Sequence, residues 1–291
     1  MNILVIGGTR FFGIHLVKSL LRRGHNVTIA TRGRAKDEFG NNVERIIIER
    51  TDASSLAAAL GTRSFDVVCD NLAYCSNDVK FLLDCLNCKR YVMTSSASVY
   101  VSEHPNKVEK DFDPLAYPLK WCSRQEFPYN EVKRQAECAL FQEYAQIPSA
   151  AVRFPYVIGE DDYTKRLYFY IEQIMKSKPI NINNLNEEIG FVRSSDAGDF
   201  LAWIVEQEFT GPVNGSNEGS ITLHEVINYT EQKTGMKAIL SDAGETGPYN
   251  GAKAFTLNTN RAEVLGYRFR ALRSWIFDLL DKYIEAAGTL K

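Results

Sequence analysis

The first 155 residues alternate between short apolar segments and amphipathic segments with helical spacing, and this alternation constrains the fold most. The predicted strands cover residues 2–6, 26–32, 43–49, 65–73, 90–97 and 149–154. The predicted helices between them cover residues 11–23, 53–60, 76–87 and 129–146. Strands that are apolar along their whole length are typical of a parallel sheet covered on both faces. The pattern therefore predicts an α/β fold with a doubly wound parallel sheet, helices on both faces and right-handed crossovers.

The segment "GGTRFFG", residues 7–13, follows the first predicted strand and opens the first predicted helix. Glycines let a backbone approach a diphosphate closely, and a helix N-terminus adds unpaired N–H groups and a positive dipole end. The strand before the loop, the helix after it and the later strands match the context of a dinucleotide site. Residues 1–155 are therefore predicted to form a dinucleotide-binding Rossmann domain, although Arg10 stands where the usual fingerprint has a third glycine.

The rest of the chain alternates less regularly. Its polar, asparagine-rich segments separate predicted helices near residues 164–178, 196–208, 222–235 and 271–286. No linker rich in proline or serine marks a boundary. We therefore expect a smaller substrate-binding subdomain over residues 156–291 that is interwoven with the first domain.

Charge and hydropathy narrow the class of function. The net charge is -2 and the isoelectric point about 6.2, without a block of basic residues, so a nucleic-acid partner is not expected. The apolar runs are shorter than the ~20 residues that cross a membrane, and the N-terminus lacks the basic region of a signal peptide. We expect a cytoplasmic protein without membrane association, whose six cysteines are reduced thiols.

Cysteine and histidine spacing predicts no metal site. Cys85 and Cys88 form an isolated C-x-x-C at the end of an apolar helical segment, where the helix dipole does not lower a thiol pKa. No second pair completes a zinc site. We expect these two thiols to be structural, and the four histidines are scattered over His15, His25, His104 and His224.

The end of the second predicted strand favours NADP over NAD. An NAD site usually has an acidic residue there, which bonds the ribose 2′-hydroxyl. This strand ends with Thr31, Arg32 and Arg34, and guanidinium groups can bind a 2′-phosphate. Arg10 is expected to reach the same phosphate from the other side; the alternative is that these arginines are solvated surface residues. Asp52, after the third strand, is expected to accept a hydrogen bond from the adenine amino group.

Tyr129 and Lys133, in "YNEVK", open the long predicted helix. Their spacing places both side chains on one helix face, with Cβ atoms about 5–6 Å apart. A tyrosine of ordinary pKa near 10 is a poor base at neutral pH, and a neighbouring ammonium lowers that pKa. Tyr129 is therefore a candidate general acid/base for a carbinol or carbonyl, and Lys133 is a candidate ligand of the nicotinamide ribose. A hydroxyl partner is available in "TSSAS", at the carboxyl end of the fifth strand, where open α/β sheets bind ligands.

Together these segments resemble the extended short-chain dehydrogenase/reductase family, the NAD(P)-dependent epimerase/dehydratase group, along nearly the whole chain. The resemblance is carried by "GGTRFFG", "DVVCDNLA", "TSSASVY", "YNEVKRQAE", "RFPYVIG", "FVRSSDAGDFL" and "NRAEVLGYRF". It implies a catalytic set of Ser96, Tyr129 and Lys133. Members of the family often dimerise through a four-helix bundle that includes the Y-x-x-x-K helix, so the resemblance is compatible with a homodimer.

Binding residues follow from the motifs and the resemblance together. The predicted cofactor contacts are Gly7, Thr9, Arg10, Phe11, Phe12, Gly13, Arg32, Asp52, Leu72, Ala73, Lys133 and Phe154. The predicted contacts with a small-molecule substrate are Ser98, Tyr156, Lys165, Arg166 and Arg193.

Three departures from the family pattern bear on the reaction. The loop variant with Arg10 is similar to that of a branch that includes the chloroplast stem-loop-binding proteins, which are associated with RNA and generally lack the catalytic tyrosine. Ile189 stands where sugar-nucleotide enzymes usually carry an arginine for the substrate diphosphate, so another cation would have to substitute. Ala97 and Ser98 stand where the dehydratases have Asp-Glu, which disfavours water elimination.

Two hypotheses of function follow. The first is an enzyme that transfers a hydride between nicotinamide and a carbinol or carbonyl carbon of a sugar nucleotide or related polar substrate, as an epimerase or a reductase. Tyr129 would move the hydroxyl proton and Ser96 would bond the same oxygen. The second is a cofactor-sensing or RNA-binding protein on the same fold, motivated by the loop variant and by Ile189.

Overall fold

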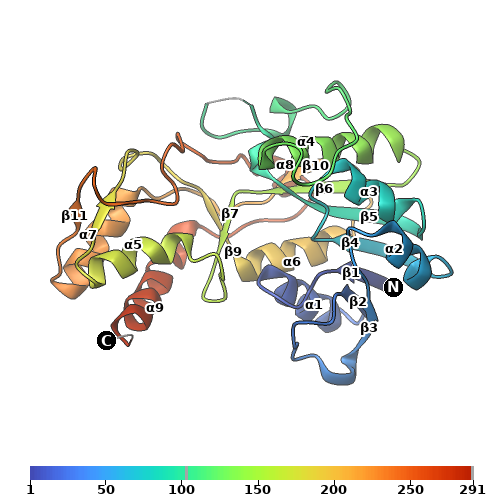
Figure 1. Cartoon of the computed structure of the whole chain (residues 1–291), viewed down its shortest axis with the longest axis horizontal. Helices are drawn as coiled ribbons and strands as arrows, with labels where there is room; N and C mark the ends of the chain where they lie inside the picture. Colours follow the sequence, from blue (N-terminus) through green and yellow to red (C-terminus); the bar gives the residue numbers. More distant parts are fainter. Residues whose placement is uncertain (102–103, 290–291) are drawn as a thin grey trace.

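A computed structural model describes residues 1–101 and 104–289 of the chain, and a seven-stranded parallel sheet lies at its centre (Figure 1). The strands follow the order β10-β6-β5-β4-β1-β2-β3. Their bounds are β1 (Asn2–Ile6), β2 (Asn26–Thr31), β3 (Val43–Ile47), β4 (Ser64–Asp70), β5 (Asn87–Ser96), β6 (Ser149–Phe154) and β10 (Gly211–Asn214). The predicted doubly wound α/β fold is confirmed.

Helices cover both faces of this sheet (Figure 1). One face carries α1 (Phe12–Arg22) and α6 (Ser194–Val205), and the other carries α2 (Ala53–Leu60), α3 (Ser76–Leu83) and α4 (Tyr129–Cys138). Side chains alternate along β1, so Ile3 and Val5 pack toward α1 and α6 while Leu4 and Ile6 pack toward α2 and α3. Both faces are therefore apolar, as the uninterrupted strand sequences predict.

The second lobe, at the left of Figure 1, surrounds a separate apolar core. Its helices are α5 (Arg166–Met175), α7 (Leu223–Thr234) and α9 (Ile276–Gly288). Its short strands are β7 (Tyr156–Ile158), β8 (Pro179–Asn181), β9 (Phe191–Arg193), β11 (Ile239–Leu240) and β12 (Glu245–Thr246). A short helix α8 (Asn260–Val264) lies against β10. None of the helices in the described part of the chain is long and apolar enough to cross a bilayer.

Segments from beyond residue 155 complete the central sheet. Strand β10 pairs with β6, and α6 packs on α1 so closely that a Cβ at Gly198 would lie 2.5 Å from the backbone nitrogen of Leu16. The chain thus enters the second lobe, returns to the sheet, and leaves it again. Interweaving of this kind explains why no linker interrupts the sequence.

Two predicted helices end earlier than expected. The helix predicted over residues 76–87 ends at Leu83, so Cys85 follows it and Cys88 lies in β5. Burial raises the pKa of both thiols, which fits a structural role. The helix predicted over 129–146 is α-helical only to Cys138 and continues as a π-helical turn over Ala139–Glu143.

A buried ion pair fixes α4 against the sheet. Arg153 of β6 and Glu137 of α4 are both fully buried, and their Nη2 and Oε2 atoms are 2.5 Å apart. Arg153 also donates to the carbonyl oxygens of Glu109 and Phe112, and Ser95 donates to Glu137. Removing one partner would leave an uncompensated buried charge, at a cost of about 3–5 kcal/mol. The network therefore sets the position of the helix that begins at Tyr129.

Candidate active site

The loop between β1 and α1 needs its glycines for conformation and for space. Gly7 and Gly8 have φ angles of 82° and 124°, which L side chains rarely adopt. A Cβ on Gly13 would lie 2.9 Å from the Cα of Gly8. The loop can therefore turn tightly and bring its backbone close to a ligand.

The missing third glycine does not damage this loop. Arg10 has no positive φ angle; the left-handed conformation falls on Phe11, at 53°. Phe11 is 7% exposed, and its ring packs edge-on against Tyr163 of the second lobe and tilted against Phe12. Packing thus holds a strained backbone in place, as is common at functional sites.

The loop leaves backbone donors unsatisfied. The amide N–H groups of residues 8–11 find no acceptor within the described residues, and the first turn of α1 carries no acidic side chain. A helix N-terminus with free amides is suited to bind phosphate groups. The donor set therefore fits the diphosphate of a dinucleotide.

A cavity of about 480 Å³ opens at this loop, at the carboxyl ends of the strands. Eight predicted cofactor contacts line it, namely Gly7, Thr9, Arg10, Phe11, Phe12, Gly13, Arg32 and Leu72. Further lining residues that the sequence did not suggest include Glu49, Arg50, Asn71, Tyr74, Arg124, Gln125 and Tyr163. Glu49 and Arg50 could have been suggested by their position directly after β3, whereas Arg124 and Tyr163 come from loops without a periodic signal.

Three exposed arginines lie along one side of the cavity, Arg10, Arg32 and Arg34. None of them has a carboxylate within ion-pair distance among residues 1–101 and 104–289. Many other exposed arginines are paired, as Arg22 is with Asp199 and Arg45 with Asp37. The cavity therefore has a local excess of positive charge.

Four of the predicted cofactor contacts do not line this cavity, namely Asp52, Ala73, Lys133 and Phe154. Asp52 is the N-cap of α2, where Oδ1 accepts from the backbone nitrogens of Ser54 and Ser55, and its hydrogen bond with the adenine amino group stays a prediction. Ala73 and Phe154 are buried at 0% and 2% exposure. Ala73 instead presents its carbonyl oxygen to Lys133.

Lys133 is a buried cation, and no carboxylate of residues 1–101 and 104–289 lies at hydrogen-bond distance from it. Its Nζ donates to the carbonyl oxygens of Ala73 (2.8 Å) and Thr94 (2.9 Å) and lies 4.7 Å from the centre of the Tyr74 ring. Burial lowers its pKa to about 8. Arg124 lies 4.5 Å from the centre of the same ring, so Tyr74 contacts two cations.

Tyr129 begins α4, and its ring is 51% exposed and edge-on to Tyr74. Loss of solvation raises its pKa, while a hydrogen bond with Ser96 and the charge of Arg166 act in the opposite direction. The expected lowering of this pKa by Lys133 is not seen: the pKa of Tyr129 is raised, and the Lys133 ammonium donates to backbone carbonyls. Ser96 and Tyr129 do lie together at the carboxyl end of β5.

The predicted substrate contacts divide into two groups. Arg166 lies with its guanidinium 5.0 Å from the centre of the Tyr156 ring, and Ser98 has a buried hydroxyl without a partner in the described residues. The structure places the other two predicted residues elsewhere. Lys165 lies over Tyr168, and Arg193 lies over Trp275 and pairs with Glu160 at 3.6 Å.

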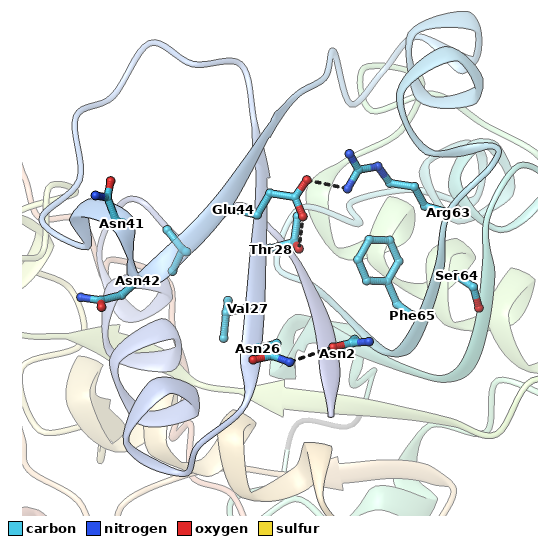
Figure 2. A pocket seen from close by; sticks show the side chains of 11 residues that line it. Asn2, Asn26, Val27, Thr28, Asn41, Asn42, Glu44, Arg63, Ser64 and Phe65 are labelled. Atoms are coloured by element: carbon cyan, nitrogen blue, oxygen red, sulfur yellow. Dashed lines mark hydrogen bonds and ion pairs between the residues drawn. The ribbon is translucent and has the colours of Figure 1, made fainter.

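A second hollow lies at the amino end of the strands and has a volume of about 600 Å³. Figure 2 shows its polar side chains facing one another: Glu44 accepts from Arg63 and Thr28, and Asn26 donates to Asn2. Among the described residues that line this hollow, the one carboxylate, Glu44, is thus already paired with the one arginine, Arg63.

Comparison with known proteins supports a relationship at the level of family and fold. Residues 3–81 match the model of the NAD dependent epimerase/dehydratase family, which confirms the resemblance seen in the sequence. The chain is 26% identical over 204 residues to the chloroplast stem-loop binding protein of 41 kDa b of Arabidopsis thaliana. That alignment covers 65% of this chain and spans half the length of the relative.

Solved structures share the fold over the whole chain. A UDP-glucose 4-epimerase from Thermotoga maritima, solved with UDP-glucose, covers 100% of both chains with a TM-score of 0.77 and 17% identity. A UDP-glucuronic acid 4-epimerase from Bacillus cereus, solved with UDP-glucuronic acid and NAD, covers 100% of both chains with a TM-score of 0.74 and 17% identity.

Proposed function

We propose, from the match of residues 3–81 to the NAD dependent epimerase/dehydratase family, that this chain is an enzyme that uses a nicotinamide dinucleotide. It would move a hydride to or from a carbinol or carbonyl carbon of a sugar nucleotide or a related polar substrate. The observation that carries the proposal is the position of Ser96 and Tyr129 at the carboxyl end of the sheet, where the glycine loop and its free amides also lie. Epimerase and reductase reactions both fit this arrangement.

In this proposal each residue of the catalytic set has its own task. The nicotinamide, when bound, would supply and accept the hydride. Tyr129 would exchange a proton with the substrate oxygen, and Ser96 would hydrogen-bond the same oxygen and fix its distance from the phenol. Lys133, whose pKa is about 8, is mostly protonated at neutral pH and would donate to ribose hydroxyls.

The raised pKa of Tyr129 favours its protonated form at neutral pH. A protonated phenol can act as a general acid toward a carbonyl oxygen, whereas oxidation of a carbinol needs the phenolate. Arg166, whose charge lowers this pKa, would therefore assist the oxidative direction.

We further propose that NADP is the preferred dinucleotide. Arg10, Arg32 and Arg34 would face the adenosine 2′-phosphate, and no carboxylate neutralises them in the described residues. A guanidinium pairs with phosphate through two parallel hydrogen bonds, which favours the phosphorylated cofactor.

The first test is to identify the nucleotide released when the purified protein is denatured, by mass spectrometry. NADP or NAD in the supernatant supports the proposal, and a stoichiometric amount favours an epimerase, which keeps its cofactor. Absence of any dinucleotide, together with no binding in an NADPH or NADH fluorescence titration, would contradict it.

The second test is the Tyr129→Phe variant. With a substrate found in a panel of UDP-sugars and sugar acids, turnover should fall about 10²–10⁴-fold because the proton donor is lost. NADPH affinity should stay the same. The control is Tyr229→Phe, which removes a phenol that donates to Asp281 in the second lobe. Equal turnover in wild type and Tyr129→Phe would remove Tyr129 from the mechanism.

A second candidate function is stem-loop RNA binding, favoured by the name of the Arabidopsis relative. The net charge of -2 argues against it, although the three unpaired arginines provide a local basic site. Binding of a stem-loop RNA that weakens steeply with salt in a gel-shift assay would favour this function. No binding at low salt would remove it.

A further inference from the structure

Arg166 begins α5 and faces the catalytic helix from the second lobe. Its guanidinium lies 5.0 Å from the centre of the Tyr156 ring. Its Nε donates to Thr164 Oγ1 (3.2 Å), and the same hydroxyl donates to Asp162 Oδ1 (2.6 Å). Thr164 therefore orients the guanidinium through Nε and separates it from the nearby carboxylate, with which it forms no ion pair.

The other two nitrogens of the Arg166 guanidinium, Nη1 and Nη2, make no hydrogen bond within the described residues. The two nitrogens form the planar fork that matches a carboxylate or a phosphate. Arg166 is half-buried, so ordering it costs side-chain entropy that a bound anion would offset.

A buried hydroxyl without a partner belongs to Tyr249, whose ring neighbours the Tyr156 ring that Arg166 lies over. Tyr249 is 1% exposed, and its Oη makes no hydrogen bond within the described residues. Its ring lies 4.7 Å from that of Tyr156, centre to centre. A buried hydroxyl without a hydrogen bond is unfavourable, so the Tyr249 Oη is available to donate to a ligand oxygen.

The positive charge of Arg166 affects the pKa values of three tyrosines. Burial raises the pKa values of Tyr129, Tyr156 and Tyr249, and in each case the positive charge of Arg166 acts against the increase. The charge of Arg166 therefore acts both on the proposed proton donor of the first domain and on two phenols of the second lobe.

The position that family relatives use for a diphosphate-binding arginine is closed in this chain. Ile189 is fully buried, and its backbone pairs with Ile221 and Phe255. With Lys165 and Arg193 directed elsewhere, Arg166 is the predicted substrate cation that acts on Tyr129.

We infer that Arg166, together with the hydroxyl of Tyr249, forms an anion subsite that holds a carboxylate or phosphate group of the substrate. The inference rests on the proposed function and narrows its substrate class to compact anionic sugars or polyols. A bound anion would occupy the Nη1–Nη2 fork and accept from Tyr249 Oη.

Calorimetric titration of the protein saturated with NADPH tests this subsite. The probes are inorganic phosphate and glucuronate, which separate a phosphate from a carboxylate source, with neutral glucose for comparison. We expect wild type to bind at least one anion and to bind glucose more weakly. Arg166→Gln should weaken anion binding about 10–100-fold, because a charge-assisted bidentate contact is lost. Tyr249→Phe should weaken it about 3–10-fold.

Two further variants control the interpretation. Arg166→Lys keeps the charge but not the fork, so its affinity should lie between those of wild type and Arg166→Gln. Arg273→Gln removes an exposed guanidinium of the same lobe that pairs with Glu225, and it should bind the anions as wild type does. Circular dichroism spectra that match wild type would show that each variant is folded.

Each outcome discriminates between the inference and the function on which it rests. Equal anion affinity in wild type and folded Arg166→Gln, or no anion binding by wild type, would overturn the subsite. NADPH fluorescence measured on the same samples reports on the proposed function separately. If NADPH binds but Arg166→Gln changes nothing, only the subsite fails; if no nicotinamide dinucleotide binds, the proposed function fails as well.

Discussion

The hollows at the two ends of the central sheet differ in whether their polar groups already have partners. In the amino-end hollow, of about 600 Å³, Glu44 is bonded by Arg63 and Thr28 (Figure 2). The carboxyl-end cavity, at about 480 Å³, keeps loop amides, three arginines and a buried lysine without neutralising partners. The free polar groups, and not the volume, therefore make the carboxyl-end cavity the candidate site.

The difference follows from the direction of parallel strands. All strands of the sheet point the same way, so the loops that open helices meet at their carboxyl ends. Free N–H groups and positive helix ends collect there, and an anion can satisfy them. The amino end has no such excess, and its charges pair among themselves. Four substitutions probe this difference between the two ends, in decreasing order of expected effect.

Gly13→Ala should damage the carboxyl-end cavity most. The new Cβ would lie 2.9 Å from Gly8 Cα, so the loop backbone must move and its amides lose their common direction. We expect NADPH affinity to fall more than 100-fold, measured by fluorescence titration, with a loss of about 1–3 kcal/mol in the free energy of unfolding. The control Gly288→Ala places its Cβ 3.8 Å from Met175 and should change neither quantity. Unchanged NADPH affinity in Gly13→Ala would show that the loop does not approach the cofactor.

Lys133→Met should change how stability depends on pH. Burial lowers the pKa of Lys133 from 10.5 to about 8, so between these values the unfolded chain holds a proton that the folded chain has lost. The free energy of unfolding of wild type should therefore rise with pH across this window, by up to about 1.4 kcal/mol per pH unit, relative to the variant. Below pH 8 folded and unfolded wild type both hold the proton on Lys133. The free energies of unfolding of wild type and Lys133→Met should therefore depend on pH in the same way there. Urea denaturation from pH 7 to 10.5 measures the difference; parallel curves would contradict the buried ammonium.

Arg10→Gly should weaken NADPH binding more than NADH binding. If the arginine faces the 2′-phosphate, NADPH affinity should fall about tenfold while NADH affinity stays within about twofold. Fluorescence titrations of both cofactors at fixed ionic strength measure the ratio. Equal losses for both would make Arg10 a loop residue without a role in cofactor choice.

Arg63→Ala tests the amino-end hollow and should have the smallest effect. Its ion pair with Glu44 is 40% and 54% exposed, so removing it should change the free energy of unfolding by less than about 0.5 kcal/mol. NADPH affinity and turnover should not change, because this hollow lies at the other end of the sheet. A large loss of either would mean that the two ends are coupled.

The glycine loop and Asp52 show what a local sequence pattern can predict and what it cannot. Gly7 and Gly13 stand beside a strand and a helix that their own neighbours specify, so their role in a tight loop follows from that pattern. Asp52 follows β3 in the chain, and its carboxylate caps α2, a contact that the position after a strand does not indicate. A local pattern predicts where a residue lies relative to a strand or helix, but it does not predict which group the side chain bonds.

Contiguous residues were enough to specify the parallel sheet, the loop at its carboxyl end and the presence of Ser96, Tyr129 and Lys133 near that loop. Strand and helix periods are local properties of the chain, and parallel strands bring their carboxyl ends together. The packing of the two lobes settled the rest: which charges stay free, why the pKa of Tyr129 rises, and that Arg166 faces it from the second lobe. Solvation and charge at a site depend on segments far apart in the chain, so they become defined only when those segments pack together.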